Sequence, residues 1–150
     1  MELRERVNSA MKEAMRARDS ARLSTIRLTT AAIKDREIAA RTTEAAMTEG
    51  DVLALLGKMV KQRIESAKVY TEGARPELAA KELAEVAVIE EFLPRALSAA
   101  EVEAAIAAAI AEAGAASLRD MGKVMALLKA RHTGQMDFGA AGAVLKARLG

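Results

Sequence analysis

The stretch EEFLPRALSAAEVEAAIAAAIAEAG, residues 90–114, decides the fold class and the division of the chain. Pro94 disfavours helical backbone at the residue before it, so a helix that reaches this point ends there. Ser98, followed three residues later by Glu101, has the pattern of a capping box that starts a new helix. That helix is rich in alanine, the best helix former, and Gly114 is suited to end it. We therefore expect helix, break and helix, with a domain boundary near Pro94.

The same signals recur along the rest of the chain. Thr48 with Asp51, and Ser117 with Asp120, are two further capping-box patterns. Apolar residues recur at intervals of three and four, which is typical of helices with one buried face. Aromatic residues make up only 2% of the sequence and β-branched residues are scattered, so a sheet would have little to pack with. The sequence predicts an all-α protein.

Seven helices are expected in two parts. Residues 1–93 should form an N-terminal helical bundle, and residues 94–150 a smaller C-terminal helical domain. The expected helices cover about 2–17, 20–41, 48–72, 76–93, 98–113, 117–133 and 137–149, with a short connection at 42–47.

Composition excludes several classes of site. The chain has no cysteine, so it has no disulfide and no thiolate metal site. No apolar run approaches the ~20 residues of a membrane-spanning helix. Glu2, Glu5 and Glu13 argue against a mitochondrial presequence, which would be poor in acidic residues. We expect a cytoplasmic protein with no membrane contact, no metal, no cofactor and no catalytic residue.

Five charged residues fall within the apolar arcs of the expected helices. Arg63 lies in the arc of the third helix, and Glu82 and Glu85 in that of the fourth. Arg27 and Lys34 lie beside the apolar face of the second. A buried charge without a partner is costly, so a structural ion-pair network is expected among them. Two alternatives are a general acid/base pair formed by Glu82 and Glu85, and contact with a ligand or partner.

Basic residues are the candidates for binding nucleic acid. The net charge is only +2, but an acidic segment at 76–93 separates basic segments on both sides. An ordinary solvated surface is the alternative. His132 is the single histidine, and its place near a helix end favours interaction with the helix dipole over catalysis. The candidates are Lys58, Lys61, Lys68 and Arg75 in the first part, and Lys123, Lys129, Arg131, His132, Lys146 and Arg148 in the second.

Several segments together resemble the YqeY family, which is related to the tail region of the GatB subunit of tRNA-dependent amidotransferase. They follow one another in order over essentially the whole chain. These segments are RLSTIRL (22–28), KQRIESAKVYTEGARPELAAKELAEVAVIEEFLP (61–94), LS (97–98) and DMGKVMALL (120–128), with Gly134 and Asp137 after them.

The resemblance implies a four-helix bundle followed by a three-helix domain. It also implies an accessory that binds tRNA or aminoacyl-tRNA, or works with a tRNA-dependent enzyme. The tract at 129–132 and Lys123 would match the basic positions. The label of carbon–nitrogen ligase with glutamine as amido donor would come only through the relationship, because the amidotransferase chemistry resides in other domains. Family members often have a basic residue after the glycine, where this chain has Gln135.

Two other functions stay open at this stage. One is a protein-interaction module that docks through a helix face such as the alanine-rich fifth helix. The other is an amidotransferase in its own right, for which we find no ATP, metal or ammonia-channel element in the sequence. The sequence leaves the oligomeric state open.

Overall fold

The computed structural model describes residues 2–43 and 46–150, and this part of the chain is helical throughout with no strand. The seven expected α-helices are present, which confirms the all-α class. The connection expected at 42–47 lies partly outside the described residues. The helices are α1 (Leu3–Ala17), α2 (Ser20–Arg41), α3 (Glu49–Glu72), α4 (Pro76–Glu90), α5 (Ala99–Ala113), α6 (Met121–His132) and α7 (Phe138–Leu149), with a 3-10 turn η1 (Leu118–Asp120) before α6.

Capping boxes start α3 and α5. At α3 the Asp51 amide donates to the Thr48 hydroxyl over 3.1 Å, and the Thr48 amide donates to the Asp51 carboxylate over 2.9 Å. Ser98 and Glu101 form the same pair of bonds at α5. At the third predicted box the Asp120 carboxylate accepts from two backbone amides, and a 3-10 turn forms there ahead of α6. These bonds satisfy amides that lack partners within their helices.

The turn between α3 and α4 bends the chain at Ala74. The helix α3 ends at Glu72, as the sequence predicts, and Gly73 after it has an ordinary φ of −86°. Ala74 takes the left-handed conformation instead, with φ of 57°. The Arg75 amide then donates to the Tyr70 carbonyl over 2.8 Å, which closes the turn before Pro76 starts α4.

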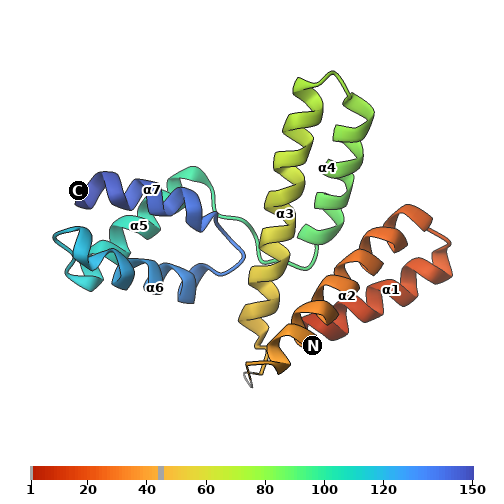
Figure 1. Cartoon of the computed structure of the whole chain (residues 1–150), viewed down its shortest axis with the longest axis horizontal. Coiled ribbons are helices and arrows are strands. Elements are labelled where there is room, and N and C mark those ends of the chain that lie inside the picture. Colours follow the sequence, from red (N-terminus) through yellow and green to blue (C-terminus); the bar gives the residue numbers. More distant parts are fainter. Residues whose placement is uncertain (1, 44–45) are drawn as a thin grey trace. The chain divides into compact units, whose positions relative to one another are not determined.

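The chain divides into two compact units, residues 1–94 and 95–150. In the first unit α1 pairs with α2 and α3 pairs with α4, so that two helical hairpins are formed (Figure 1). The hairpins share one apolar core, built from the first half of α3, the end of α4, and the inner faces of α1 and α2. Its fully buried members include Leu3, Val7, Ile26, Val52, Leu56 and Ile89.

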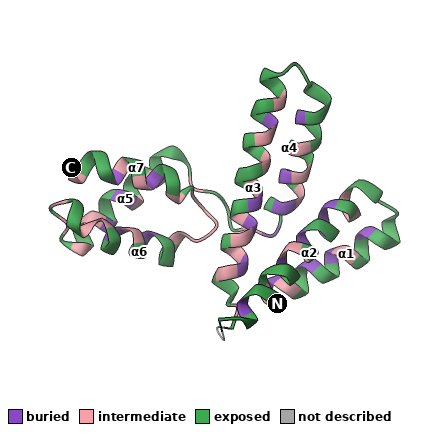
Figure 2. Cartoon of the chain, viewed as in Figure 1, coloured by how far each residue is buried: buried purple, intermediate pink, exposed green. Residues whose placement is uncertain are grey.

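The farther parts of α3 and α4 pack only on each other within this unit. Ala67, Ala79 and Val86 are their buried residues there, while both helices are otherwise largely exposed toward the connecting turn (Figure 2). In the second unit α5, α6 and α7 surround a separate small core. It contains Ile106, Ala109, Val124, Leu128, Ala141 and Leu145.

Glu101 makes the stability of the start of α5 depend on pH. Arg95 donates to both Glu101 oxygens, over 2.8 and 2.7 Å, and the Ser98 backbone donates to one of them. The Arg95 guanidinium first, and then Ser98, lower the pKa of Glu101 from 4.5 to about 2. Because the pKa is lowered by folding, the stabilisation is present above about pH 4.5 and is lost as the pH falls toward 2.

We predict that Glu101→Gln lowers the melting temperature at pH 6 and that its difference from the wild type narrows below pH 4.5. Glutamine keeps the capping geometry and removes the charge, so the pH-dependent part is isolated. Thermal unfolding followed by circular dichroism between pH 6 and pH 3 measures it. A difference that stays constant over this range would contradict the prediction.

Candidate nucleic-acid interface

An ion pair joins α3 to α4 beyond the shared core. Arg63 Nε donates to Glu85 Oε2 over 2.8 Å, and the side chains are only 16% and 17% exposed. The Arg63 guanidinium also donates to the Met59 carbonyl over 3.3 Å. Glu82 is half-buried one turn away on α4 and has no ion-pair partner among the described residues. The pair therefore fixes the two helices against each other and leaves neither of its own charges uncompensated.

The positions of Arg27 and Lys34 differ from the prediction of a buried ion-pair network. Both were expected beside the apolar face of the second helix, as members of one structural ion-pair network with Arg63, Glu82 and Glu85. Both are exposed, and neither has an ion-pair partner within the described ranges. The reason is that α2 turns a different side toward the other hairpin: Thr25 and Thr29 are its buried polar residues. The predicted network is thus reduced to the Arg63–Glu85 pair.

Two arginines proposed to contact RNA instead hold the small unit together. Arg131 of α6 pairs with Glu112 of α5, and Arg148 of α7 pairs with Glu103 of α5. The hydrogen bond from Arg131 lowers the pKa of Glu112. Because these guanidiniums already have carboxylate partners, they are poorly placed to bind phosphate. Sequence reasoning missed the two glutamates, since only the packing of α5 on its neighbours reveals them.

His132 is the last residue of α6. Its Nδ1 is 3.4 Å from Gln135 Oε1, and the Gln135 amide group donates to the Arg95 carbonyl over 3.0 Å. The Gln135 carbonyl accepts from the Leu97 amide over 2.9 Å. Gln135 therefore ties two segments of the small unit together.

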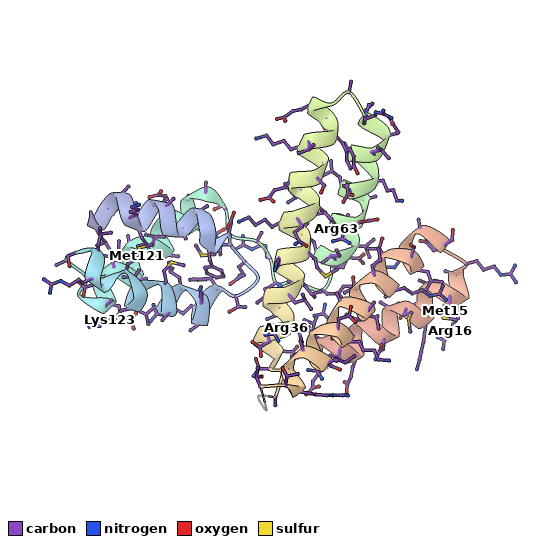
Figure 3. The ribbon with its side chains drawn as sticks, in the orientation of Figure 1. Met15, Arg16, Arg36, Arg63, Met121 and Lys123 are labelled. Atoms are coloured by element: carbon purple, nitrogen blue, oxygen red, sulfur yellow. The ribbon has the colours of Figure 1, made fainter. Side chains whose placement is uncertain are left out.

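Six of the ten basic candidates are exposed and have no ion-pair partner among the residues described. Lys61 is exposed but has a partner interaction of its own. Lys123 projects from α6 into solvent (Figure 3). The six exposed candidates that have no ion-pair partner in the described residues are Lys58, Lys68, Arg75, Lys123, Lys129 and Lys146.

Metal binding would need clustered acidic or histidine side chains, and crossing a membrane would need a long apolar helix. Within the described ranges, no three acidic or histidine side chains gather closely enough to hold a metal ion. None of the helices there combines the length and hydrophobicity that crossing a bilayer requires.

The fold and the charged surfaces define an all-helical protein in which arginine–glutamate pairs bridge helices and several lysines remain in solvent. A family model of YqeY-like proteins matches residues 4–149, almost the whole chain, and the chain belongs to this family.

Two curated relatives are similar over part of the chain. Altered inheritance of mitochondria protein 41, mitochondrial, of Clavispora lusitaniae is 36% identical over 83 residues. The protein of the same name from Vanderwaltozyma polyspora is 34% identical over 83 residues. Each match covers 55% of this chain but only 46% and 44% of the two relatives, so it spans a little under half of their length.

These relatives overturn the expectation of a cytoplasmic location. Both are named as mitochondrial proteins. The expectation rested on acidic residues near the N-terminus and on the lack of cysteine, and neither feature determines the compartment in which a protein works.

The Arg63–Glu85 pair can be tested by a double-mutant cycle. We predict that Arg63→Met lowers the free energy of unfolding by about 1–2 kcal/mol, because the half-buried Glu85 carboxylate loses its partner. The double variant Arg63→Met with Glu85→Leu should recover much of this loss. Urea unfolding measures all variants.

Lys68→Met is the matched control for this cycle. It removes an exposed cation from the same helix and should change stability by no more than about 0.5 kcal/mol. An Arg63→Met variant as stable as the wild type would show that the pair has no structural role.

Proposed function

We propose that the chain is a non-catalytic accessory protein that binds tRNA or aminoacyl-tRNA. The observation that carries the proposal is the set of six exposed cations without ion-pair partners in the described part of the chain. A cation that has no carboxylate partner can approach phosphate without first breaking a contact, and each one that does so releases counterions from the nucleic acid. The relationship of the YqeY family to the amidotransferase tail suggests tRNA as the nucleic acid.

Recognition would rest on phosphates and shape. Base stacking needs exposed aromatic side chains, and this chain has three aromatic residues. Phe92 is buried, while Tyr70 and Phe138 are half-buried. Lysine side chains, which place a compact charge on a flexible stem, suit contact with a phosphate backbone of variable sequence.

The proposal assigns no chemical step to this chain. A label of carbon–nitrogen ligase with glutamine as amido donor would describe the complete amidotransferase and belongs to domains that bind its substrates. An accessory role requires only that the tRNA be held.

A protein-interaction module is the second candidate. It is favoured by exposed apolar side chains on the α3–α4 hairpin, where Ile64, Val69 and Leu83 are 48%, 64% and 51% exposed. Binding of a partner enzyme that persists after nuclease treatment and in high salt would favour this candidate over the first.

The tRNA proposal predicts salt-dependent binding through the small unit. Replacing Lys123, Lys129 and Lys146 with glutamine should make the slope of log K against log salt shallower by about two to three, since each lost phosphate contact removes about 0.7–0.9. Titration of labelled total tRNA at about 50 mM and 200 mM salt measures the slope.

Lys81→Gln is the control for this titration, because it removes an exposed cation that is not among the candidates. It should leave the slope of the wild type unchanged. Failure of the wild type to bind tRNA at the lower salt concentration, or an unchanged slope in the triple variant, would rule out the proposal.

We also propose that the chain consists of two domains, a four-helix bundle at 1–93 and a three-helix domain at 94–150. Support comes from the two separate apolar cores. The expected result is that residues 95–150 expressed alone stay helical and unfold in one cooperative transition, as measured by circular dichroism. A non-cooperative or unfolded fragment would contradict independent folding.

A further inference from the structure

The outer side of the α1–α2 hairpin carries two rows of side chains. Spacings of three and four residues place Arg4, Asn8, Met11 and Met15 on one side of α1, and Leu23, Arg27, Thr30 and Lys34 on one side of α2. A shallow groove of about 210 Å³ is lined by Arg4 and Asn8 from the first row and by Thr30 and Lys34 from the second. The rows therefore face the same side of the hairpin, and we call them together the outer face.

The outer face is not the side that packs against the other hairpin. Toward α4, α1 uses Arg6, which donates to the Glu91 carbonyl over 3.0 Å and lies 6.0 Å from the centre of the Phe92 ring. Arg22 of α2 pairs with the Glu91 carboxylate. Arg4 donates to the Met47 carbonyl over 3.2 Å, and Met11 and Leu23 pack partly against the core. The other side chains of the outer face are less covered, and Asn8, Met15, Arg27 and Lys34 are exposed.

The outer face carries positive charge. Arg27 and Lys34 lie two helical turns apart, are exposed, and have no ion-pair partner in the described ranges. Glu37 is the single acidic residue among those that line the grooves of this face, and Arg4 pairs with it over 2.7 Å. A ligand with carboxylates would complement the two remaining cations.

Its other component is apolar. Met15 is 51% exposed near the end of α1, next to Arg16 (Figure 3). A second shallow groove of about 340 Å³ is lined by Leu23, Arg27 and Leu28, the last of them 47% exposed. Methionine adapts its shape to what it contacts, and exposed methionine and leucine are typical of surfaces that receive helices.

The combination of cations with exposed apolar side chains distinguishes between two kinds of anionic partner, a nucleic acid and an acidic helix. A phosphate backbone would use the cations but would gain nothing from Met15 and Leu23, and the rows contain no aromatic residue on which a base could stack. An amphipathic helix with acidic flanks would use both components. The α1 row runs from Arg4 to Met15, a rise of about 17 Å, which matches about three turns of a helix.

We propose that the outer face binds an acidic amphipathic helix of a partner protein, with its apolar side on Met11, Met15 and Leu23 and its carboxylates toward Arg27 and Lys34. This site is distinct from the lysines proposed to bind tRNA. It can therefore be present or absent independently of that function.

The test uses the full chain and synthetic peptides. The first probe is a fluorescein-labelled 18-residue peptide with leucine at helical spacing on one side and glutamate on its flanks. The second has the same composition in scrambled order. We expect the first to bind at least about tenfold more tightly in fluorescence anisotropy, since only it presents a continuous apolar side.

Variants then locate the site. Arg27→Gln with Lys34→Gln should weaken binding of the helical peptide about five- to tenfold, and Met15→Ser about threefold. Arg36→Gln is the matched control, because it removes an exposed cation of α2 that lies outside the rows, and it should leave binding unchanged. Circular dichroism of each variant checks that the helices are intact.

Three results would overturn the proposal. One is equal binding of the two peptides, and another is undiminished binding by the Arg27→Gln, Lys34→Gln variant. The third is that this double variant loses affinity for total tRNA, or loses self-association in sedimentation, while peptide binding is unchanged. The outer face would then be a surface for RNA or for a second copy of the chain. Failure of the Lys123, Lys129 and Lys146 variant to change tRNA binding would leave this proposal intact.

Discussion

The fold of the first unit depends on its shared apolar core, at which its four helices meet. Leu56 of α3, Ile26 of α2 and Ile89 of α4 are completely buried there, with Leu3 and Val7 of α1. Burial stabilises in proportion to the apolar area removed from water, and the alanines that fill much of this sequence contribute little area each. The few large apolar side chains must therefore meet in one place, and the positions of all four helices follow from it.

The shared core is too small to include the whole of the α3–α4 hairpin, and part of the hairpin lies outside it. Beyond Met59 the buried residues of the two helices are Ala67, Ala79 and Val86, and the Arg63–Glu85 pair joins the helices there. A hydrogen-bonded pair at this point sets the rotation of one helix on the other, which alanine contacts alone specify weakly. The same arrangement leaves Ile64 and Leu83 exposed, because no third element of the unit covers that part of the hairpin.

Local signals predicted the helices well, because caps and breaks depend on neighbouring residues. Ser98 and Glu101 form their bonds within four residues of chain, so the sequence alone reveals them. The buried face of α2 was harder to predict, since two threonines occupy it. Thr29 donates to the Thr25 carbonyl over 3.0 Å, and Thr25 to the Ala21 carbonyl over 3.3 Å.

Hydroxyls satisfied in this way can be buried without another partner, so polarity did not mark the exposed side of the helix. This explains why Arg27 and Lys34, which the sequence pattern placed beside the apolar face of the helix, are exposed. Pairing between helices could not be predicted for a related reason: Arg131 meets Glu112, and Arg148 meets Glu103, only after α5 has packed. Each of these arginines donates to its glutamate through one guanidinium nitrogen. A guanidinium is less strongly hydrated than an ammonium group, which favours such pairing. Lysines gain less from such fixed pairing, which leaves Lys123, Lys129 and Lys146 in solvent. The arginines that pair with glutamates thus hold helices together, while these lysines, together with Arg27 and Arg75, have no ion-pair partner in the described residues and remain available to a partner.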